Sequence, residues 1–332
     1  MNKIIKIKTL IVGVFLLGLT FLGSAAKSNE TKQIAVSVIQ VVEHPALDAT
    51  RKGILDELKE QGYSPENNLK WSFETAQNSP LLASQISQKF AFDKPDVIVA
   101  IGTLAGQSAL RPARTQDIPV VFSSVTDPLG AQLVSSLERP AGNVTGVSNL
   151  IPVVPQFELF REILPQLKRI GMVYNPGEIN SVKMVELCQA AANELGIELI
   201  TAMAEKSIDV NAAAHHLTAE GVDALFVSND NTALSAFKTL IKIATENNIP
   251  VFCSDTDYVY FGALAALGPN QYLHGRQTGR IIIDILKGKA PTEIPVGFPE
   301  KTELFLNQKM AKTLGITLPS KLIQEASTVI NY

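Results

Sequence analysis

A glycine-threonine pair between an apolar run and a helical pattern could form an anion site. Gly102-Thr103 follows the apolar run Val97–Ile101 and precedes a small-residue helix start at Leu104-Ala105. Exposed backbone N–H groups at the start of a helix attract a carboxylate or a phosphate, and a glycine lets that anion come close. The same pair is equally well explained as a tight turn with a helix cap, and one residue can serve both purposes.

Four side chains could extend this anion site. Thr103 and Gln107 could donate hydrogen bonds to the anion, and Ser123 and Ser124 end the next apolar run, which should lie beside the same loop. Open α/β sheets bind their ligands just past the carboxyl ends of their strands. We therefore predict that these four residues contribute to a ligand site.

Acidic and amide side chains follow two later apolar runs. Asn229-Asp230-Asn231 comes after Ala224–Val227, and Asp255 and Asp257 come after Val251–Cys253. Asp255 is the preferred partner for an ammonium group because it follows its strand directly. Any single one of the other residues is better explained as a helix cap or a turn residue. N–H groups on one side of a site and a carboxylate on the other would suit a zwitterion such as an amino acid.

A few aromatic and polar residues could complete the site. Tyr174 ends an apolar run and Tyr258 follows the Asp255 loop, so either ring could stack on a flat ligand. Gln40 and His44 follow the first apolar run at the expected mouth of the site, and His44 is expected to be a surface loop residue.

No pattern of catalytic residues supports an enzyme. The sequence lacks a G-x-S-x-G pentapeptide, and the nearest string, Gly106 to Ala109, misses the second glycine. It also lacks a P-loop, a G-x-G-x-x-G after the first strand, and a cluster of Cys and His that would hold zinc. We expect no enzymatic activity, no cofactor and no metal.

Apolar runs alternate with helical patterns along the chain, which predicts parallel, doubly wound sheets. Strands are predicted at Ile34–Val42, Leu69–Thr75, Val97–Ile101, Val120–Phe122, Arg169–Tyr174, Glu198–Met203, Ala224–Val227 and Val251–Cys253, and a connection from Asp127 leads to Val144–Ser148. Helices are predicted at Ala46–Gln61, Pro80–Phe92, Gln156–Leu164, Ser181–Leu195, Val210–Ala219, Thr232–Glu246, His274–Leu286 and Asn307–Leu314.

One strand-loop-helix-strand unit occurs twice, which predicts two similar lobes joined by a hinge. Ile118-Pro119-Val120 in the first copy matches Ile249-Pro250-Val251 in the second. The predicted N-terminal lobe covers 33–148 and the C-terminal lobe 149–290, with 291–332 returning across the hinge onto the N-terminal lobe. The Pro- and Gly-rich stretch 127–143 is expected to cross between the lobes.

The N-terminus and the composition predict an exported protein. Met1–Lys8 is basic, Thr9–Gly23 is apolar, and Ser24-Ala25-Ala26 offers a cleavage site, so 1–26 reads as a signal peptide rather than an uncleaved anchor. We therefore expect a soluble periplasmic protein, and a monomer. The net charge of −3 over 332 residues, without a basic stripe, argues against nucleic acid as a partner. Cys188 and Cys253 are expected to be buried thiols, although export would permit a disulfide.

The chain resembles the extracytoplasmic substrate-binding proteins of ABC transporters, within the type I periplasmic-binding fold. It is most similar to the branch that includes binding proteins for tryptophan and other aromatic amino acids. The motifs that carry the resemblance are Ile101-Gly102-Thr103 followed by Gln107-Ser108, Val125–Pro128, Asn143–Val147, Val173–Pro176, Asp230–Thr232 and Gly262–Gly268.

The resemblance implies a small ligand, an amino acid, held in a cleft between two lobes that close around it and are then recognised by a membrane permease. By position, it places the ligand carboxylate at Gly102, Thr103 and Ser124, the amine at Asp255 with Asn149 or Asp230, and the side chain near Gln40, Tyr174 and Tyr258. Fold does not determine the ligand, so a sugar or a nucleoside is a second possibility. The sequence also leaves open a sensor that reports to a membrane receptor, and an exported hydrolase that uses Ser108.

Overall fold

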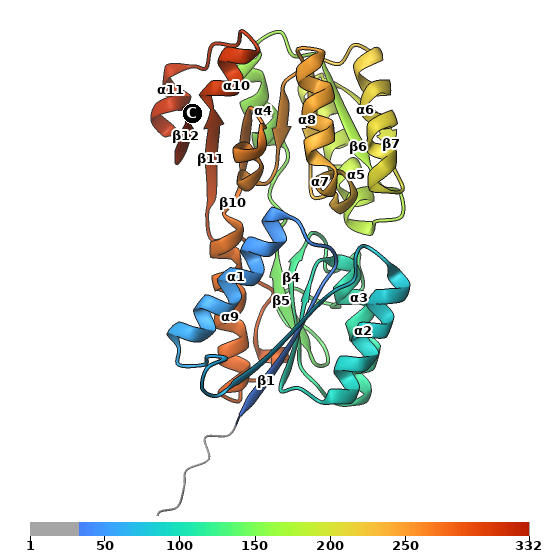
Figure 1. The fold of residues 1–332 in the computed structure, drawn as a ribbon, viewed down its shortest axis with the longest axis vertical. Coiled ribbons are helices and arrows are strands. Elements are labelled where there is room, and N and C mark those ends of the chain that lie inside the picture. The colour runs from blue at the N-terminus through green and yellow to red at the C-terminus, as the bar shows by residue number, and fades with distance from the viewer. Residues whose placement is uncertain (1–32, 332) are drawn as a thin grey trace, which may run out of the picture. The chain divides into compact units, whose positions relative to one another are not determined.

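The computed structural model describes residues 33–331, and the predicted signal peptide at 1–26 lies outside them. The chain from Gln33 onward forms one compact unit that contains two β-sheets, each flanked by helices (Figure 1). The predicted fold class, α/β with two mainly parallel sheets, is confirmed.

The N-terminal lobe is built on a five-stranded parallel sheet with strand order β2-β1-β3-β4-β5. Its central strands β1, β3 and β4 are mainly apolar, and β3 is entirely so, as expected for strands covered by helices on both faces of the sheet. The strands are β1 Ile34–Gln40, β2 Leu69–Thr75, β3 Val97–Ile101, β4 Val120–Val125 and β5 Val144–Ser148. The helices that follow β1, β2 and β3 are α1 Pro45–Glu60, α2 Pro80–Asp93 and α3 Thr103–Thr115.

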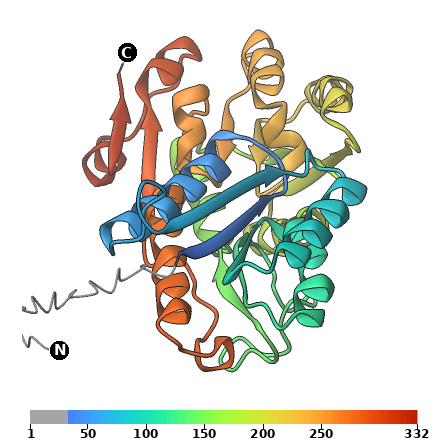
Figure 2. The same cartoon turned by 60° about the horizontal axis from the view of Figure 1, so that its bottom comes forward.

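The C-terminal lobe has a seven-stranded sheet with strand order β12-β11-β10-β9-β8-β6-β7. Only the β10–β11 pair is antiparallel, and β11 and β12 lie side by side at one edge (Figure 2). The strands are β6 Arg169–Tyr174, β7 Glu198–Met203, β8 Ala224–Val227, β9 Val251–Cys253, β10 Ala265–Pro269, β11 Thr302–Asn307 and β12 Thr328–Ile330. The α-helices are α4 Val154–Ile163, α5 Ile179–Leu195, α6 Val210–Ala219, α7 Asn231–Ser235, α8 Phe237–Glu246, α10 Gln308–Thr313 and α11 Ser320–Glu325, and the 3₁₀-helices are η1 Ser207–Asp209 and η2 Thr256–Phe261.

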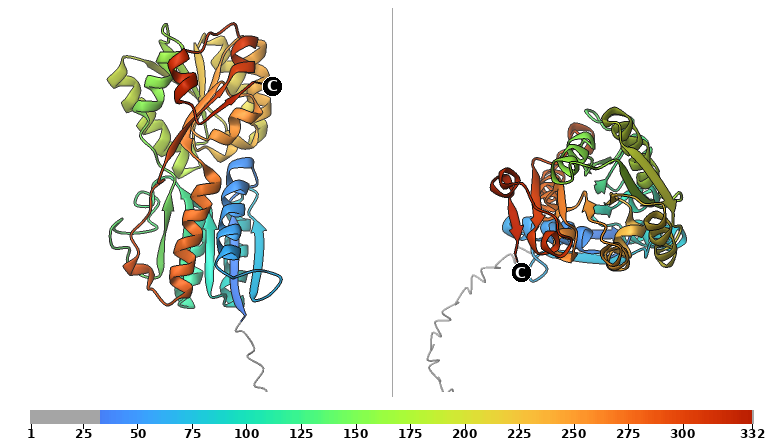
Figure 3. Two further views of the ribbon diagram at one scale, coloured as in Figure 1. Left: turned by 90° about the vertical axis from the view of Figure 1, so that its left-hand side faces the viewer. Right: turned by 90° about the horizontal axis from the view of Figure 1, so that it is seen from above.

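The division of the chain between the lobes differs from the prediction. Helix α9, Gln271–Leu286, packs on α1, and its Ile282 and Ile283 belong to the core of the N-terminal lobe rather than to the predicted C-terminal lobe of 149–290. After η3, Pro291–Glu293, the chain rises again to the other lobe (Figure 3, left). There β11 pairs with β10. The prediction that this segment packs on the N-terminal lobe is therefore wrong for 302–331, which belongs to the C-terminal lobe. Helical periodicity marks an apolar face but does not say which sheet that face will cover.

Three smaller features also differ from the prediction. The stretch 127–143 does not cross between lobes but links β4 to β5, with Leu133 and Val134 in the N-terminal core. The helix predicted at Thr232–Glu246 divides at Ala236 into α7 and α8. Helix α11 and strands β10 to β12 were not anticipated.

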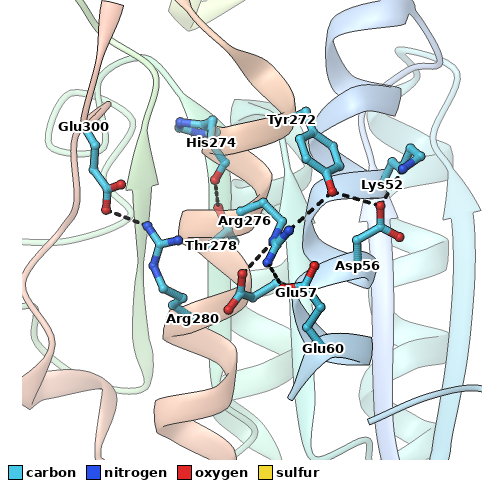
Figure 4. A network of polar contacts seen from close by, with 10 residues as sticks. All are labelled: Lys52, Asp56, Glu57, Glu60, Tyr272, His274, Arg276, Thr278, Arg280 and Glu300. Carbon is cyan, nitrogen blue, oxygen red and sulfur yellow. Dashed lines mark hydrogen bonds and ion pairs between the residues drawn. The ribbon is translucent and has the colours of Figure 1, made fainter. Parts of the chain in front are cut away.

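Helices α1 and α9 are in very close contact. A Cβ atom on Gly275 would lie 2.0 Å from the Thr50 carbonyl oxygen, so only glycine allows this approach of the two backbones. Arg276 of α9 donates to a Glu57 oxygen at 2.6 Å and also bonds Glu60, which ties the helices together further along (Figure 4). The first turns of α1 and α9 are therefore held in a fixed relation to each other.

No helix within 33–331 is long and apolar enough to cross a membrane. Cys188 and Cys253 are buried free thiols, as predicted.

Candidate ligand-binding site

A small cavity lies where the strands of both lobes end. Its walls come from loops that follow β1, β3, β4 and β5 in one lobe and β6, β8, β9 and β10 in the other, as expected for parallel sheets. The lining residues are His44, Ala46, Leu47, Thr103, Ser124, Thr126, Asn149, Asn180, Asn229, Asn231, Leu234, Asp255 and Gln271.

The N-terminal lobe presents a helix start to this cavity. Gly102 precedes α3 with φ +94°, and a side chain there would lie 2.5 Å from the Cγ1 atom of Val41, so glycine is required. Thr103, the first residue of α3, is 3% exposed, and its Oγ1 is buried without a hydrogen-bond partner in the described chain. An unpartnered hydroxyl at a helix N-terminus is suited to bind a carboxylate.

The C-terminal lobe presents one carboxylate, Asp255. It is 3% exposed, and no basic residue within 33–331 pairs with it. Burial raises the pKa of Asp255 to about 7, against the opposing effect of a hydrogen bond that Gln271 Nε2 donates to Oδ1. Gln271 Oε1 in turn accepts from Thr50 Oγ1 at 3.2 Å. A buried carboxylate of this kind is stabilised by a ligand that brings a positive charge.

Amide side chains form the remaining polar wall. Thr126 Oγ1 contacts Asn149 Oδ1 at 3.3 Å and receives a hydrogen bond from Asn229 Nδ2 at 3.3 Å. Asn180 Nδ2 donates to the Asn229 carbonyl at 2.7 Å, and Asn231 lies beside His44. These contacts join side chains of the two lobes across the cavity.

The two lobes are closed on each other in this structure. The cavity has a volume of about 10 Å³, which is the space of a single water molecule. A hollow of about 530 Å³ opens beside it and shares Thr103, Asn180 and Asn231 with its wall. Across the mouth, Asn78 Nδ2 donates to Glu178 Oε1 at 3.0 Å and to Thr232 Oγ1 at 3.1 Å.

The structure brings four of the predicted site residues together around the cavity: Thr103, Ser124, Asn149 and Asp255. Gly102 shapes the loop before α3, and its backbone N–H donates a hydrogen bond to the Ser123 carbonyl at 2.9 Å. Gln107 lines the outer hollow, where its Nε2 donates to the Ala131 carbonyl. These residues surround the space that was expected to hold the ligand.

The other predicted site residues lie elsewhere and have internal partners. Gln40 is fully buried and bonds Asp48 and Arg51, and Ser123 Oγ pairs with Thr278 at 2.7 Å. Tyr174 packs at the edge of the C-terminal core. Tyr258 is 1% exposed, and its hydroxyl donates to the Leu234 carbonyl.

Asp230 serves as the cap of α7. Its Oδ1 accepts the Ala233 N–H at 2.6 Å, and its Oδ2 accepts the Asn175 N–H at 2.6 Å and the Ser181 hydroxyl at 2.5 Å. Burial and the nearby Glu178 raise the pKa of Asp230 to about 7. The helix-cap explanation of Asp230 therefore fits its contacts, and Asp255 is the single acid that lines the cavity.

Several lining residues were missed by the sequence reasoning. His44 was expected at the mouth of the site and does form part of the wall, but it is 5% exposed, so its assignment to a surface loop was wrong. Gln271 was missed because Ala265–Pro269 was not identified as a strand, and Asn180 because it lies within the first turn of α5. The rule that places polar residues after strand ends would have found Gln271 once that strand was recognised.

Comparison with known proteins identifies the family. Residues 35–330 match the family described as ABC transporter substrate binding protein. The chain belongs to this family. It is 36% identical over 290 residues to the tyrosine-binding protein of Clostridioides difficile (strain R20291), covering 87% of this chain and 83% of the relative.

Two solved structures of family relatives differ in their state. An ABC domain in complex with L-Trp from Streptococcus pneumonia is 34% identical and superposes with a TM-score of 0.86, over 90% of this chain and 100% of that one. The ligand-free, open structure of a substrate binding protein from Clostridium difficile is 35% identical with the same coverage, but its TM-score is 0.68. The two relatives are almost equally similar to this chain in sequence. The lower TM-score of the open structure therefore fits lobes that are arranged differently from those of the present structure. The present structure thus resembles the L-Trp complex, in agreement with its closed cavity.

Proposed function

We propose that this protein binds an aromatic amino acid as its zwitterion in the cavity between the lobes. The observation that carries the proposal is Asp255, the one acid in the cavity wall, buried and without a cationic partner in the described chain. The free Thr103 hydroxyl and the start of α3 provide the complementary contacts for a carboxylate. The names of two relatives, a tyrosine-binding protein and an L-Trp complex, support an aromatic ligand.

The ligand enters a more open form than the one described. A drug-sized ligand typically occupies about 300–1,000 Å³, whereas the closed cavity holds about 10 Å³. The lobes must therefore separate before an aromatic amino acid is bound, and the outer hollow beside Thr103 marks the mouth. Closure around the ligand follows because the closed state contacts it from both lobes.

The biological role that fits is delivery of the bound amino acid to the permease of an ABC importer. Family membership supports this partner, and the basic and apolar segments at the N-terminus support export to the periplasm. The protein acts as a monomer that needs neither catalysis nor a cofactor.

The test is a binding screen of the mature protein, beginning at Lys27, against the amino acids, common sugars and nucleosides. A ligand present at 100 times its Kd raises the free energy of unfolding by about 2.7 kcal/mol, which thermal unfolding will detect. We expect stabilisation by aromatic amino acids and none by their N-acetyl or methyl-ester derivatives. Stabilisation by a sugar or nucleoside alone would overturn the proposal.

The amine contact is tested with matched variants. Asp255→Asn should weaken binding by about 2–5 kcal/mol, because it leaves a buried ammonium without its counter-charge. Asp257→Asn is the control, since Asp257 is a half-buried acid of the same loop that does not line the cavity. Equal affinities of the two variants, with intact folding, would reject the role of Asp255.

A further inference from the structure

His44 is a buried histidine with one ring nitrogen unused. It precedes α1, lines the cavity and is 5% exposed. Its Nε2 lies 3.4 Å from Asn231 Oδ1, while its Nδ1 is buried without any hydrogen-bond partner in the described chain. A buried polar atom without a partner is unfavourable, and at the wall of a binding site it indicates a contact that a ligand completes.

The neighbours of His44 determine which nitrogen carries the proton. Asn231 Nδ2 donates to Glu178 Oε2 at 2.7 Å, which turns Asn231 Oδ1 toward His44. An amide oxygen only accepts hydrogen bonds, so His44 Nε2 must be the donor. Burial lowers the pKa of His44 to about 4, so the ring is neutral near pH 7 and Nδ1 is a bare acceptor.

We propose that His44 Nδ1 accepts a hydrogen bond from a donor on the ligand's aromatic ring, a phenol O–H or an indole N–H, and so selects tyrosine and tryptophan over phenylalanine. This inference rests on the proposed function and assigns a specificity-determining residue to it. A ring without a donor leaves the acceptor buried and unpaired, which should weaken binding by about 10- to 100-fold.

His44 and the predicted amine contact, Asp255, line the same cavity but belong to different hydrogen-bonded groups. His44 belongs to a hydrogen-bonded group with Asn231 and Glu178, two residues that also line the outer hollow. Asp255 belongs to a different group, in which Gln271 connects it to Thr50 of α1. The two groups share no hydrogen bond, so one can hold the amine while the other contacts the ring.

The experiment measures Kd by calorimetry for L-tyrosine, L-tryptophan, L-phenylalanine and O-methyl-tyrosine. We expect the wild-type protein to bind tyrosine or tryptophan about 10- to 100-fold more tightly than phenylalanine and O-methyl-tyrosine. His44→Gln can keep the contact with Asn231 but loses the acceptor at the δ position, so this preference should disappear. His44→Asn restores an acceptor at the δ position and should recover part of it.

A control variant distinguishes ring recognition from general damage. Thr103→Val, at the expected carboxylate contact, should weaken tyrosine and phenylalanine by the same factor and leave their ratio unchanged. If His44→Gln also weakens both amino acids equally, His44 does not contact the ring and the inference is rejected. Absence of binding of every aromatic amino acid to the wild-type protein would instead reject the proposed function.

Discussion

Asn78 offers a test of how much the closed state depends on contacts between the lobes. It is half-buried in the loop before α2, and its side chain donates across the mouth to Glu178 and Thr232. It does not line the inner cavity. Its backbone has φ +56°, a conformation in which glycine is unstrained, so Asn78→Gly removes the side chain without disturbing the loop.

The expected loss follows from the two hydrogen bonds. A bond to a charged group contributes about 1.5–3 kcal/mol and a neutral one about 0.5–1.5 kcal/mol. Water at the mouth will replace part of this, so we expect a net loss of about 2 kcal/mol, or roughly 30-fold in Kd. Because the contact acts on closure, the factor should be the same for every ligand that the protein binds.

The assay combines calorimetric Kd values for two ligands with small-angle scattering of the ligand-free protein. Asn78→Gly should weaken both ligands by one factor and shift the ligand-free protein toward an expanded form. Gln77→Gly is the matched control, because Gln77 also has a positive φ of +49° but is exposed. Unchanged affinity, or a loss confined to one ligand, would refute the reasoning.

Two further predictions concern stability. Burial raises the pKa of Asp255 from 3.8 to about 7, so the folded state binds the proton more tightly than the unfolded state, and this residue makes the protein less stable as pH rises from about 4 to 7. Asp255→Asn should therefore raise the Tm of the ligand-free protein at pH 7.5 but not at pH 4, and an equal shift at both pH values would contradict this assignment. Arg276→Gln should cost about 3 kcal/mol in chemical denaturation because it leaves a buried glutamate of α1 unpaired, whereas Arg280→Gln, at an exposed pair, should cost less than about 1 kcal/mol. Similar losses in the two arginine variants would show that the α1–α9 pair contributes no more than a surface pair.

Much of the fold could be predicted because most of its elements have a strong local signal. Continuous apolar runs such as Val97–Ile101 marked the buried parallel strands, and Gly102 marked the turn into α3. The assignment of α9 to the N-terminal lobe could not be predicted in this way, because it depends on close packing through Gly275 against Thr50, a contact far away in sequence.

The site was predicted in part for a related reason. Thr103 and Asp255 follow strands directly, and this position alone brings them to the cavity. Asp230 has the same kind of position, but its side chain turns back to cap α7. His44 is buried because it contacts Asn231 of the opposite lobe. A contact between lobes cannot be predicted from the residues next to His44 in the sequence.

The return of α9 to the N-terminal lobe also determines the order in which the chain can fold. The core of that lobe includes Ile282, Ile283 and Val296, so this core is incomplete until most of the polypeptide has been made. In many proteins an N-terminal domain folds while the rest of the chain is still being synthesised. We expect that the N-terminal lobe of this chain cannot complete its folding in that way. A fragment ending at Ser148 would contain all five strands of the sheet and still lack the helix that covers α1. Such long-range contacts slow folding, because the entropy of closing a long loop is lost before the contacts form.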